Sequence, residues 1–209
     1  MTHLATFDAA FAQCPLIAIL RGVAPNEVEA IGDALVDAGF TLIEVPLNSP
    51  DPLDSIARLA RRLSGRAMVG AGTVLREADV AAVADVGGTL IISPNTNPAV
   101  IVASAARGLI SLPGIATPTE AFAALGAGAT ALKLFPAEAA SPAVLKAMRA
   151  VLPKDMRVLP VGGIAPDNMQ PWRDAGAAGF GLGSALYQPG LTANEVGERA
   201  AAFVAAIRA

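Results

Sequence analysis

The sequence has few of the residues that build metal centres, disulfides and surfaces for polyanions. Its 209 residues include one cysteine, Cys14, and one histidine, His3. A single cysteine excludes a disulfide within the chain, and a lone histidine does not supply the ligands of a zinc site. The 15 lysines and arginines do not gather on one segment, and the net charge is −3. We therefore expect no metal, no other cofactor and no nucleic-acid partner.

Long apolar runs are also missing, although 54% of the residues are hydrophobic. No uninterrupted run approaches the roughly 18 residues of a membrane span. The first residues contain no basic region followed by an apolar core, so we expect no secretory signal and no membrane partner. A cytoplasmic protein with a single domain over 1–209 fits this composition and length.

What the sequence does contain is a repeated unit of a short apolar strand followed by an alanine-rich helix. We expect strands over 16–22, 42–46, 68–73, 90–94, 109–114, 131–136, 157–163 and 179–184. We expect helices over 25–38, 52–63, 76–86, 98–107, 118–126, 142–151, 167–175 and 193–208, after a short amphipathic helix over 4–13. Eight such units predict an α/β fold, the (β/α)₈ TIM barrel with a short N-terminal helix. A doubly wound open sheet is the alternative, although it requires no such regular count to eight.

One of only three lysines, Lys133, stands in the apolar run 131–136. Burial disfavours the charged ammonium and lowers the pKa of the amine. A lysine that is neutral near pH 7 can attack a carbonyl and form a Schiff base. The alternative is a structural lysine that extends to water or joins a buried ion pair.

Glu44 is an acidic residue inside the second expected strand. Because side chains alternate along a strand, Leu42 and Glu44 should point inward while Ile43 and Val45 face the helices. Lys133 and Phe135 should share the inward side in the same way. A glutamate beside an inward lysine can transfer the protons of imine chemistry, whereas a salt bridge to Lys133 or Arg21 is the structural alternative.

Further polar residues fall at the ends of the expected strands, where the active sites of barrels form. Arg21 closes the first strand and Thr73 the third. A guanidinium and a hydroxyl can together hold a substrate carboxylate. Asn48 and Ser49 lie just past Glu44 and could either cap the next helix or touch the substrate.

Glycines follow the seventh and eighth strands, at Gly162, Gly163 and Gly183, with Ser184 after the last of them. Glycines let the main chain approach an anion, and backbone N–H groups at a following helix start supply donors. These loops are also where barrels commonly bind phosphate. Tight turns alone are the structural alternative for such glycines.

Segments along nearly the whole chain resemble the 2-keto-3-deoxy-6-phosphogluconate/galactonate aldolases. They are 19–22, 43–49, 69–75, 92–94, 132–138 and 161–164. The resemblance implies a homotrimeric class I aldolase on a (β/α)₈ barrel. Such an enzyme cleaves a six-carbon phosphorylated keto acid to pyruvate and glyceraldehyde 3-phosphate.

The resemblance also implies a role for each candidate site residue. Lys133 would form the Schiff base with C2, and Glu44 would move protons through water as the carbinolamine collapses and at C3. The substrate would be held by Arg21 and Thr73 at the carboxylate, by Phe135 and Pro94 as walls, and by Gly162, Gly163, Gly183 and Ser184 at the phosphate.

Two departures from the gluconate branch look like the 6-phosphogalactonate branch, whose substrate is inverted at C4. This chain has the run 46–49, Pro-Leu-Asn-Ser, where the gluconate branch has an arginine and a threonine, and Val161 where that branch has a threonine. Valine removes a hydrogen bond that could read the C4 hydroxyl, and the carboxylate clamp then rests more on Arg21. Use of both epimers remains open.

Two other functions would use the same glycine loops. A sugar-phosphate isomerase or epimerase would need no inward lysine. A non-catalytic regulator would bind a phosphorylated sugar and would lose no chemistry on Lys133→Met.

Overall fold

The computed structural model describes residues 2–209, which form parallel strands and surrounding helices. The strands are β1 Leu16–Ile19, β2 Leu42–Pro46, β3 Met68–Gly72, β4 Leu90–Ile92, β5 Ile110–Leu112, β6 Gly114–Ile115, β7 Leu132–Leu134, β8 Val158–Pro160 and β9 Phe180–Leu182. The helices are α1 His3–Gln13, α2 Val28–Asp37, α3 Pro52–Arg62, α4 Glu77–Asp85, α5 Pro98–Ala106, α6 Pro118–Gly126, the 3₁₀ helix η1 Ala137–Ala139, α7 Pro142–Arg149, α8 Met169–Asp174 and α9 Ala193–Arg208.

The strands form two parallel sheets, with the orders β5-β4-β3-β2-β1-β9 and β6-β7-β8. The expected strand over 109–114 is divided into β5 and β6 at Pro113, which has no N–H for a ladder. At the other junction, Val161 makes a single parallel bridge to Gly181, and the Ala178 N–H donates to the Val158 carbonyl at 3.0 Å. The predicted α/β class with parallel strands is confirmed.

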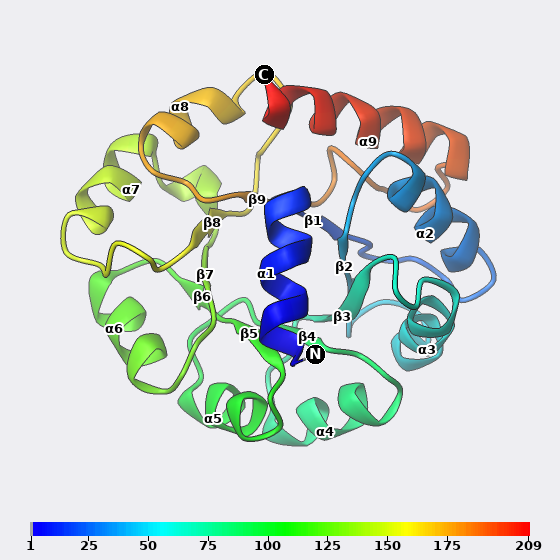
Figure 1. The fold of residues 1–209 in the computed structure, drawn as a ribbon, viewed down its shortest axis with the longest axis horizontal. Coiled ribbons are helices and arrows are strands. Elements are labelled where there is room, and N and C mark those ends of the chain that lie inside the picture. Colours follow the sequence, from blue (N-terminus) through cyan, green and yellow to red (C-terminus); the bar gives the residue numbers. More distant parts are fainter. Residues whose placement is uncertain (1) are drawn as a thin grey trace.

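Helices α2 to α9 surround the strands, and α1 lies across the centre of this ring (Figure 1). One apolar layer packs between strands and outer helices, and includes Ile43, Val45 and Leu132. A second layer lies among the strands and includes Leu42 and Leu90. Every strand residue is therefore buried, from one side or the other.

Helix α1 confirms the expected N-terminal helix and covers the end at which the strands begin. Its Phe7 and Phe11 belong to the inner apolar layer. The Asp8 carboxylate accepts a hydrogen bond from Arg157 Nη1 at 2.6 Å, and the Thr41 hydroxyl donates to the Ala10 carbonyl at 2.8 Å. These contacts fix the helix over the strands.

Two helices begin later than the sequence indicates because an acidic or amide side chain closes a turn first. Glu27 Oε1 accepts from the Ala24 N–H at 3.1 Å, and α2 starts only at Val28. Asn168 Oδ1 accepts from the Ala165 N–H at 3.0 Å before α8.

Within residues 2–209, none of the helices is both long enough and apolar enough to cross a membrane.

Candidate active site

Strands β2 and β7 point Glu44 and Lys133 toward the same small interior cavity of about 10 Å³. Its other lining residues are Ile17, Ile19, Ile92, Leu112, Leu159, Val161 and Gly181. Ile43 and Val45 lie instead in the outer apolar layer. The predicted alternation along β2 is confirmed, because a strand turns successive side chains to opposite faces.

Lys133 is 5% exposed, and its Nζ lies 4.8 Å from the centroid of the Phe135 ring. Burial lowers the pKa of this amine, and the positive charge of Arg21 lowers it further, whereas Glu44 raises it. The effect of burial is the largest of the three. Because its pKa is lowered, Lys133 is deprotonated more often at a given pH than a free lysine.

Glu44 is 1% exposed, and its Oε2 has no hydrogen-bond partner among residues 2–209. Burial raises the pKa of this carboxyl, against the opposing effects of Lys133 and Arg21. The salt bridges within 4.0 Å in the described chain include neither Glu44 nor Lys133. No salt bridge therefore supports the structural alternative, and Glu44 retains an oxygen that can carry a proton.

Gly72 is a functional position that the sequence interpretation missed. It lies opposite Pro46 in the β2–β3 ladder, and a Cβ built on it would overlap the Glu44 carboxylate. The available signal was the pair Gly70 and Gly72, which the two-residue period of β3 turns to the same face. A side chain at position 72 would displace the carboxylate from its place.

A cavity of about 450 Å³, the mouth cavity, opens where β1, β7, β8 and β9 end. Its lining includes the predicted site residues Arg21, Lys133, Phe135, Val161, Gly162, Gly163, Gly183 and Ser184. It meets the interior cavity at Lys133, Ile19 and Val161, which line both. Glu44 thus lies beneath the mouth cavity, with Lys133 between the two spaces.

Thr73 and Pro94 line neither cavity. Thr73 has a φ of 57°, and it follows the glycine that contacts Glu44. Pro94 packs beneath β6, where a Cβ on Gly114 would overlap its carbonyl. The roles assigned to these two residues stay predictions.

Arg21 is held by the loop that follows β2. Its Nη1 donates to Asn48 Oδ1 at 2.7 Å, and the adjacent Gly22 N–H donates to Ser49 Oγ at 2.9 Å. The N-cap of α3 is Asp51, so the capping alternative for Asn48 and Ser49 is wrong. These two residues position the first loop instead, a contact that local sequence cannot reveal.

The loop after β9 holds the same segment from the other side. The Tyr187 hydroxyl donates to Glu27 Oε1 at 3.0 Å, and a Cβ on Gly22 would lie 2.8 Å from Pro189 Cγ. Gly22 has a φ of 85°, which disfavours any residue with a side chain. Burial and the Glu27 carboxylate both raise the pKa of the Tyr187 hydroxyl. The hydroxyl therefore stays a hydrogen-bond donor at neutral pH.

The glycines after β8 form a turn on the wall of the mouth cavity. Gly162 and Gly163 have φ values of 112° and 66°. A Cβ on either one would meet the side chain of Glu138, which also lines the mouth cavity.

Nearby, a Cβ on Gly181 would lie 2.7 Å from a methyl group of Val161. Gly181 therefore makes the space that Val161 fills.

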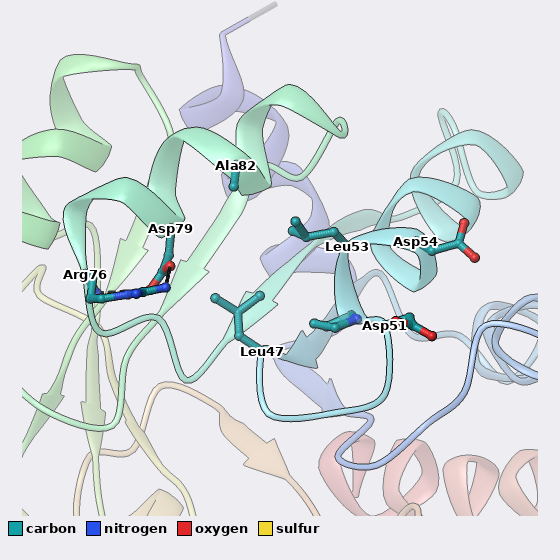
Figure 2. A pocket seen from close by; sticks show the side chains of 8 residues that line it. Leu47, Asp51, Leu53, Asp54, Arg76, Asp79 and Ala82 are labelled. Atoms are coloured by element: carbon teal, nitrogen blue, oxygen red, sulfur yellow. Dashed lines mark hydrogen bonds and ion pairs between the residues drawn. The ribbon is translucent and has the colours of Figure 1, made fainter.

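A second hollow, of about 480 Å³, lies between the β2–α3 loop and α4 (Figure 2). Arg76 and Asp79 point toward one another there and form an ion pair of 2.6 Å. Asp54, at its edge, is paired with Arg58 at 3.0 Å. None of the predicted site residues lines this hollow, so we assign the active site to the mouth cavity.

The parallel α/β fold, with a buried lysine at the mouth and a buried glutamate beneath it, defines an enzyme of the aldolase class. The model of the KDPG and KHG aldolase family, in which KDPG is 2-keto-3-deoxy-6-phosphogluconate, matches residues 7–203. The chain belongs to this family.

Two curated relatives are similar over most of their length. A probable 2-dehydro-3-deoxy-6-phosphogalactonate aldolase of Rhizobium meliloti (strain 1021) is 50% identical, covering 92% of this chain and 91% of the relative. The 2-dehydro-3-deoxy-6-phosphogalactonate aldolase of Escherichia coli (strain K12) is 49% identical, covering 93% and 95%. A solved structure described as native KDPGal is 48% identical, covers 94% of this chain and 95% of that chain, and superposes with a TM-score of 0.92.

Proposed function

We propose that this protein is a class I aldolase that cleaves 2-dehydro-3-deoxy-6-phosphogalactonate to pyruvate and D-glyceraldehyde 3-phosphate, and that catalyses the reverse addition. The observation that carries the proposal is Lys133, a buried amine without a salt bridge in the described chain, at the base of the mouth cavity. The two curated relatives named for this activity support it. A solved KDPG aldolase of Legionella pneumophila, 25% identical with a TM-score of 0.82, holds pyruvate as a covalent carbinolamine.

The reaction begins when the neutral Lys133 amine attacks C2 of the keto acid and forms a carbinolamine. Loss of water, with a proton from Glu44, gives a cationic imine between C2 and the lysine nitrogen. The C4 hydroxyl then loses its proton, through water, to the Glu44 carboxylate as the C3–C4 bond breaks. The bonding electrons move into the imine and form an enamine, and C4 leaves as the aldehyde carbon.

The second half of the reaction returns the enzyme to its starting state. A proton delivered through Glu44 and water to C3 converts the enamine to the pyruvate imine. Water then adds to C2, and the C–N bond breaks to release pyruvate and the free Lys133 amine. Burial raises the pKa of Glu44, which favours the protonated carboxyl that this step requires.

We assign the two anionic ends of the substrate to two different parts of the site. Arg21, held by Asn48, binds the carboxylate with Thr73, while Pro94 and Phe135 form walls. Backbone N–H groups of the turn at Gly162 and Gly163, with Gly183 and Ser184, bind the phosphate.

Val161 supports the galactonate epimer as the preferred substrate. Its side chain lines both cavities and offers no hydrogen bond to a C4 hydroxyl. The test is to compare kcat/KM for the two C4 epimers in the wild-type protein and in Val161→Thr. We expect the wild type to favour the galactonate epimer and the threonine to shift the ratio toward the gluconate epimer. Preference for the gluconate epimer, or equal use of both, would refute the assignment, and binding without cleavage would indicate a regulator.

We infer that residues 1–209 form one domain, in which the two sheets close into a (β/α)₈ barrel. The Val161–Gly181 bridge and the Thr130 N–H, which donates to the Ser111 carbonyl at 2.9 Å, support closure at the two junctions. Amide hydrogen exchange tests this, because a closed barrel should protect the N–H groups of 130 and 178 as strongly as those within the larger sheet.

We also propose that the chain assembles as a homotrimer. A cage described as designed by fusing symmetric oligomeric domains contains a chain 48% identical to this one, with a TM-score of 0.92, over 94% of this chain and 73% of that chain. Sedimentation equilibrium should give about three times the 21.0 kDa of one chain. A single species at the mass of a monomer or dimer would refute the trimer.

We also propose a cytoplasmic location. It is supported by the proposed substrate, a phosphate ester with several negative charges that does not enter a lipid bilayer. Cell fractionation should recover the protein with cytoplasmic enzymes. Recovery with the membrane or the extracellular fraction would contradict this.

A further inference from the structure

Glu138 occupies the wall of the mouth cavity beside the glycine turn that follows β8. It lies in η1, where the Ala137 N–H donates to the Val161 carbonyl at 2.9 Å and ties this helix to the wall. A Cβ on Gly162 would overlap the Glu138 carboxylate, and a Cβ on Gly163 would lie 2.8 Å from its Cγ. The carboxylate therefore rests directly on the two glycines.

The Glu138 carboxylate has no side-chain partner in the described chain. Over residues 2–209, the salt bridges and side-chain hydrogen bonds do not include Glu138. An ionised carboxylate can only accept hydrogen bonds, so its natural ligand partner is a hydroxyl or an N–H group.

The position of Glu138 identifies which part of a substrate it meets. This step rests on the proposed function, in which Lys133 holds C2 and the turn at Gly162 and Gly163 binds the phosphate on C6. The hydroxyl nearest to that phosphate along the carbon chain is on C5. We propose that Glu138 accepts a hydrogen bond from the C5 hydroxyl and thereby selects aldehydes that carry a hydroxyl next to the phosphorylated carbon.

The same carboxylate works against phosphate esters that lack this hydroxyl. A negative charge beside a bound phosphate is repulsive, and a hydrogen bond from the ligand offsets part of that repulsion. A phosphorylated aldehyde without the hydroxyl makes no such hydrogen bond, so the repulsion between its phosphate and the Glu138 carboxylate is not offset. Selection thus arises from an attractive and a repulsive contact with one side chain.

The test is the aldol addition of pyruvate to two aldehydes, D-glyceraldehyde 3-phosphate and its analogue without the 2-hydroxyl, 3-phosphooxypropanal. The ratio of kcat/KM for the two aldehydes is measured in the wild type, in Glu138→Ala and in Glu138→Gln. Glu198→Ala, which removes an exposed glutamate from α9, is the matched control for net charge.

We expect Glu138→Ala to lower the ratio by about tenfold, the size of a hydrogen bond to a charged group that is partly open to water. Glu138→Gln should lower it less, because the amide oxygen still accepts, and Glu198→Ala should not change it. Exchange of the C3 protons of pyruvate with solvent should be the same in all four proteins, because that half-reaction involves no aldehyde.

Two results would overturn the role of Glu138 alone. One is an unchanged ratio in Glu138→Ala, and the other is an equal change for both aldehydes, which indicates charge repulsion without reading of the hydroxyl. A wild-type protein that neither exchanges pyruvate protons nor adds aldehydes would overturn the proposed function, and the Glu138 proposal with it. If the wild type exchanges the C3 protons of pyruvate but Glu138→Ala leaves the kcat/KM ratio unchanged, the role of Glu138 fails while the proposed function stands.

Discussion

The two ends of the strands both place a cation over an aromatic ring, but they differ in how that cation is paired. At the end covered by α1, the Arg157 guanidinium lies 5.5 Å and 4.9 Å from the centroids of Phe7 and Phe11, and it pairs with Asp8 at 2.6 Å. At the mouth, Lys133 lies 4.8 Å from the Phe135 centroid, with no salt bridge within 4.0 Å in the described chain.

This difference in pairing gives Arg157 a structural role and leaves Lys133 available for the reaction. Arg157 keeps 31% of its side chain exposed, so its burial costs little desolvation, and its ion pair with Asp8 holds α1 in place. Lys133 is buried without such a partner, and burial lowers the pKa of its amine. A lysine, unlike an arginine, can give up its proton in such a place and become a nucleophile.

Removing each cation in turn tests whether Lys133 and Arg157 have these different roles. Lys133→Met should reduce kcat by roughly 10⁴-fold or more, since the covalent path is lost. Arg157→Met should leave kcat per folded molecule unchanged and lower the thermal midpoint. Retro-aldol rates and melting curves of both variants measure this. Activity retained in Lys133→Met would contradict the account.

The next effect concerns the proton carrier beneath the mouth. Glu44→Gln should lower kcat by roughly 10²- to 10⁴-fold, the usual contribution of a general acid or base. Gly72→Ala should have a comparable effect, because the added Cβ overlaps the Glu44 carboxylate. Steady-state kinetics check both, with Gly126→Ala in α6 as the control, since a Cβ there meets nothing within 4 Å. An unchanged kcat in Gly72→Ala would show that the carboxylate can move without loss.

The charges around Lys133 predict opposite shifts of its titration. Glu44 raises the pKa of Lys133, so Glu44→Gln should lower it and move the half-maximal modification of the amine to a lower pH. Arg21 lowers the pKa of Lys133, so Arg21→Met should move that half-maximum to a higher pH. Reductive methylation with formaldehyde, followed by mass spectrometry of the peptide that contains Lys133, gives both values. Shifts in the same direction would contradict the assigned causes.

At the closed end, the comparison predicts loss of stability without loss of chemistry. Phe7 is fully buried, and Phe7→Ala should cost about 3–5 kcal/mol of unfolding free energy. Leu4→Ala on the same helix is the control, because Leu4 is 51% exposed. Urea unfolding gives the free energies, and kcat at a temperature where all variants are folded should be equal. A lower kcat in Phe7→Ala would mean that the two ends are coupled.

The smallest effect concerns the residue that positions Arg21. Asn48→Ala removes a 2.7 Å hydrogen bond and should raise the KM for pyruvate by about 3- to 10-fold with little change in kcat. Asn26→Ala, an exposed change in the loop after β1, is the control. Proton exchange at C3 of pyruvate measures both constants. A fall in kcat with unchanged KM would contradict a positioning role.

Much of the fold could be predicted because the signals were local. The period of two in β2 correctly placed Glu44 inward, and the apolar run around Lys133 correctly indicated a buried strand. Helix boundaries failed where a side chain closed a turn first, as Glu27 does before α2. The division of the expected strand 109–114 into β5 and β6 was missed because the prediction did not consider that Pro113 has no N–H for the ladder.

The parts of the site that could not be predicted depend on contacts between distant loops. Asn48 reaches Arg21, and Tyr187 reaches Glu27, across loops whose separation in space no sequence period determines. Glu138 stood in a recognised segment, yet its approach to Gly162 depends on η1 folding onto Val161. The pattern of a single sequence indicates to which face of a sheet a strand residue points. It does not indicate which distant loop a loop residue contacts.

In the proposed mechanism, Lys133 attacks the keto carbon as a neutral amine. The most direct test is borohydride reduction of the wild-type protein in the presence of pyruvate, followed by intact and peptide mass spectrometry. We expect one pyruvate-derived adduct per chain, on the peptide that contains Lys133, and no adduct in Lys133→Met. A folded protein that binds pyruvate but forms no adduct, or forms it on Lys146 or Lys154, would contradict it.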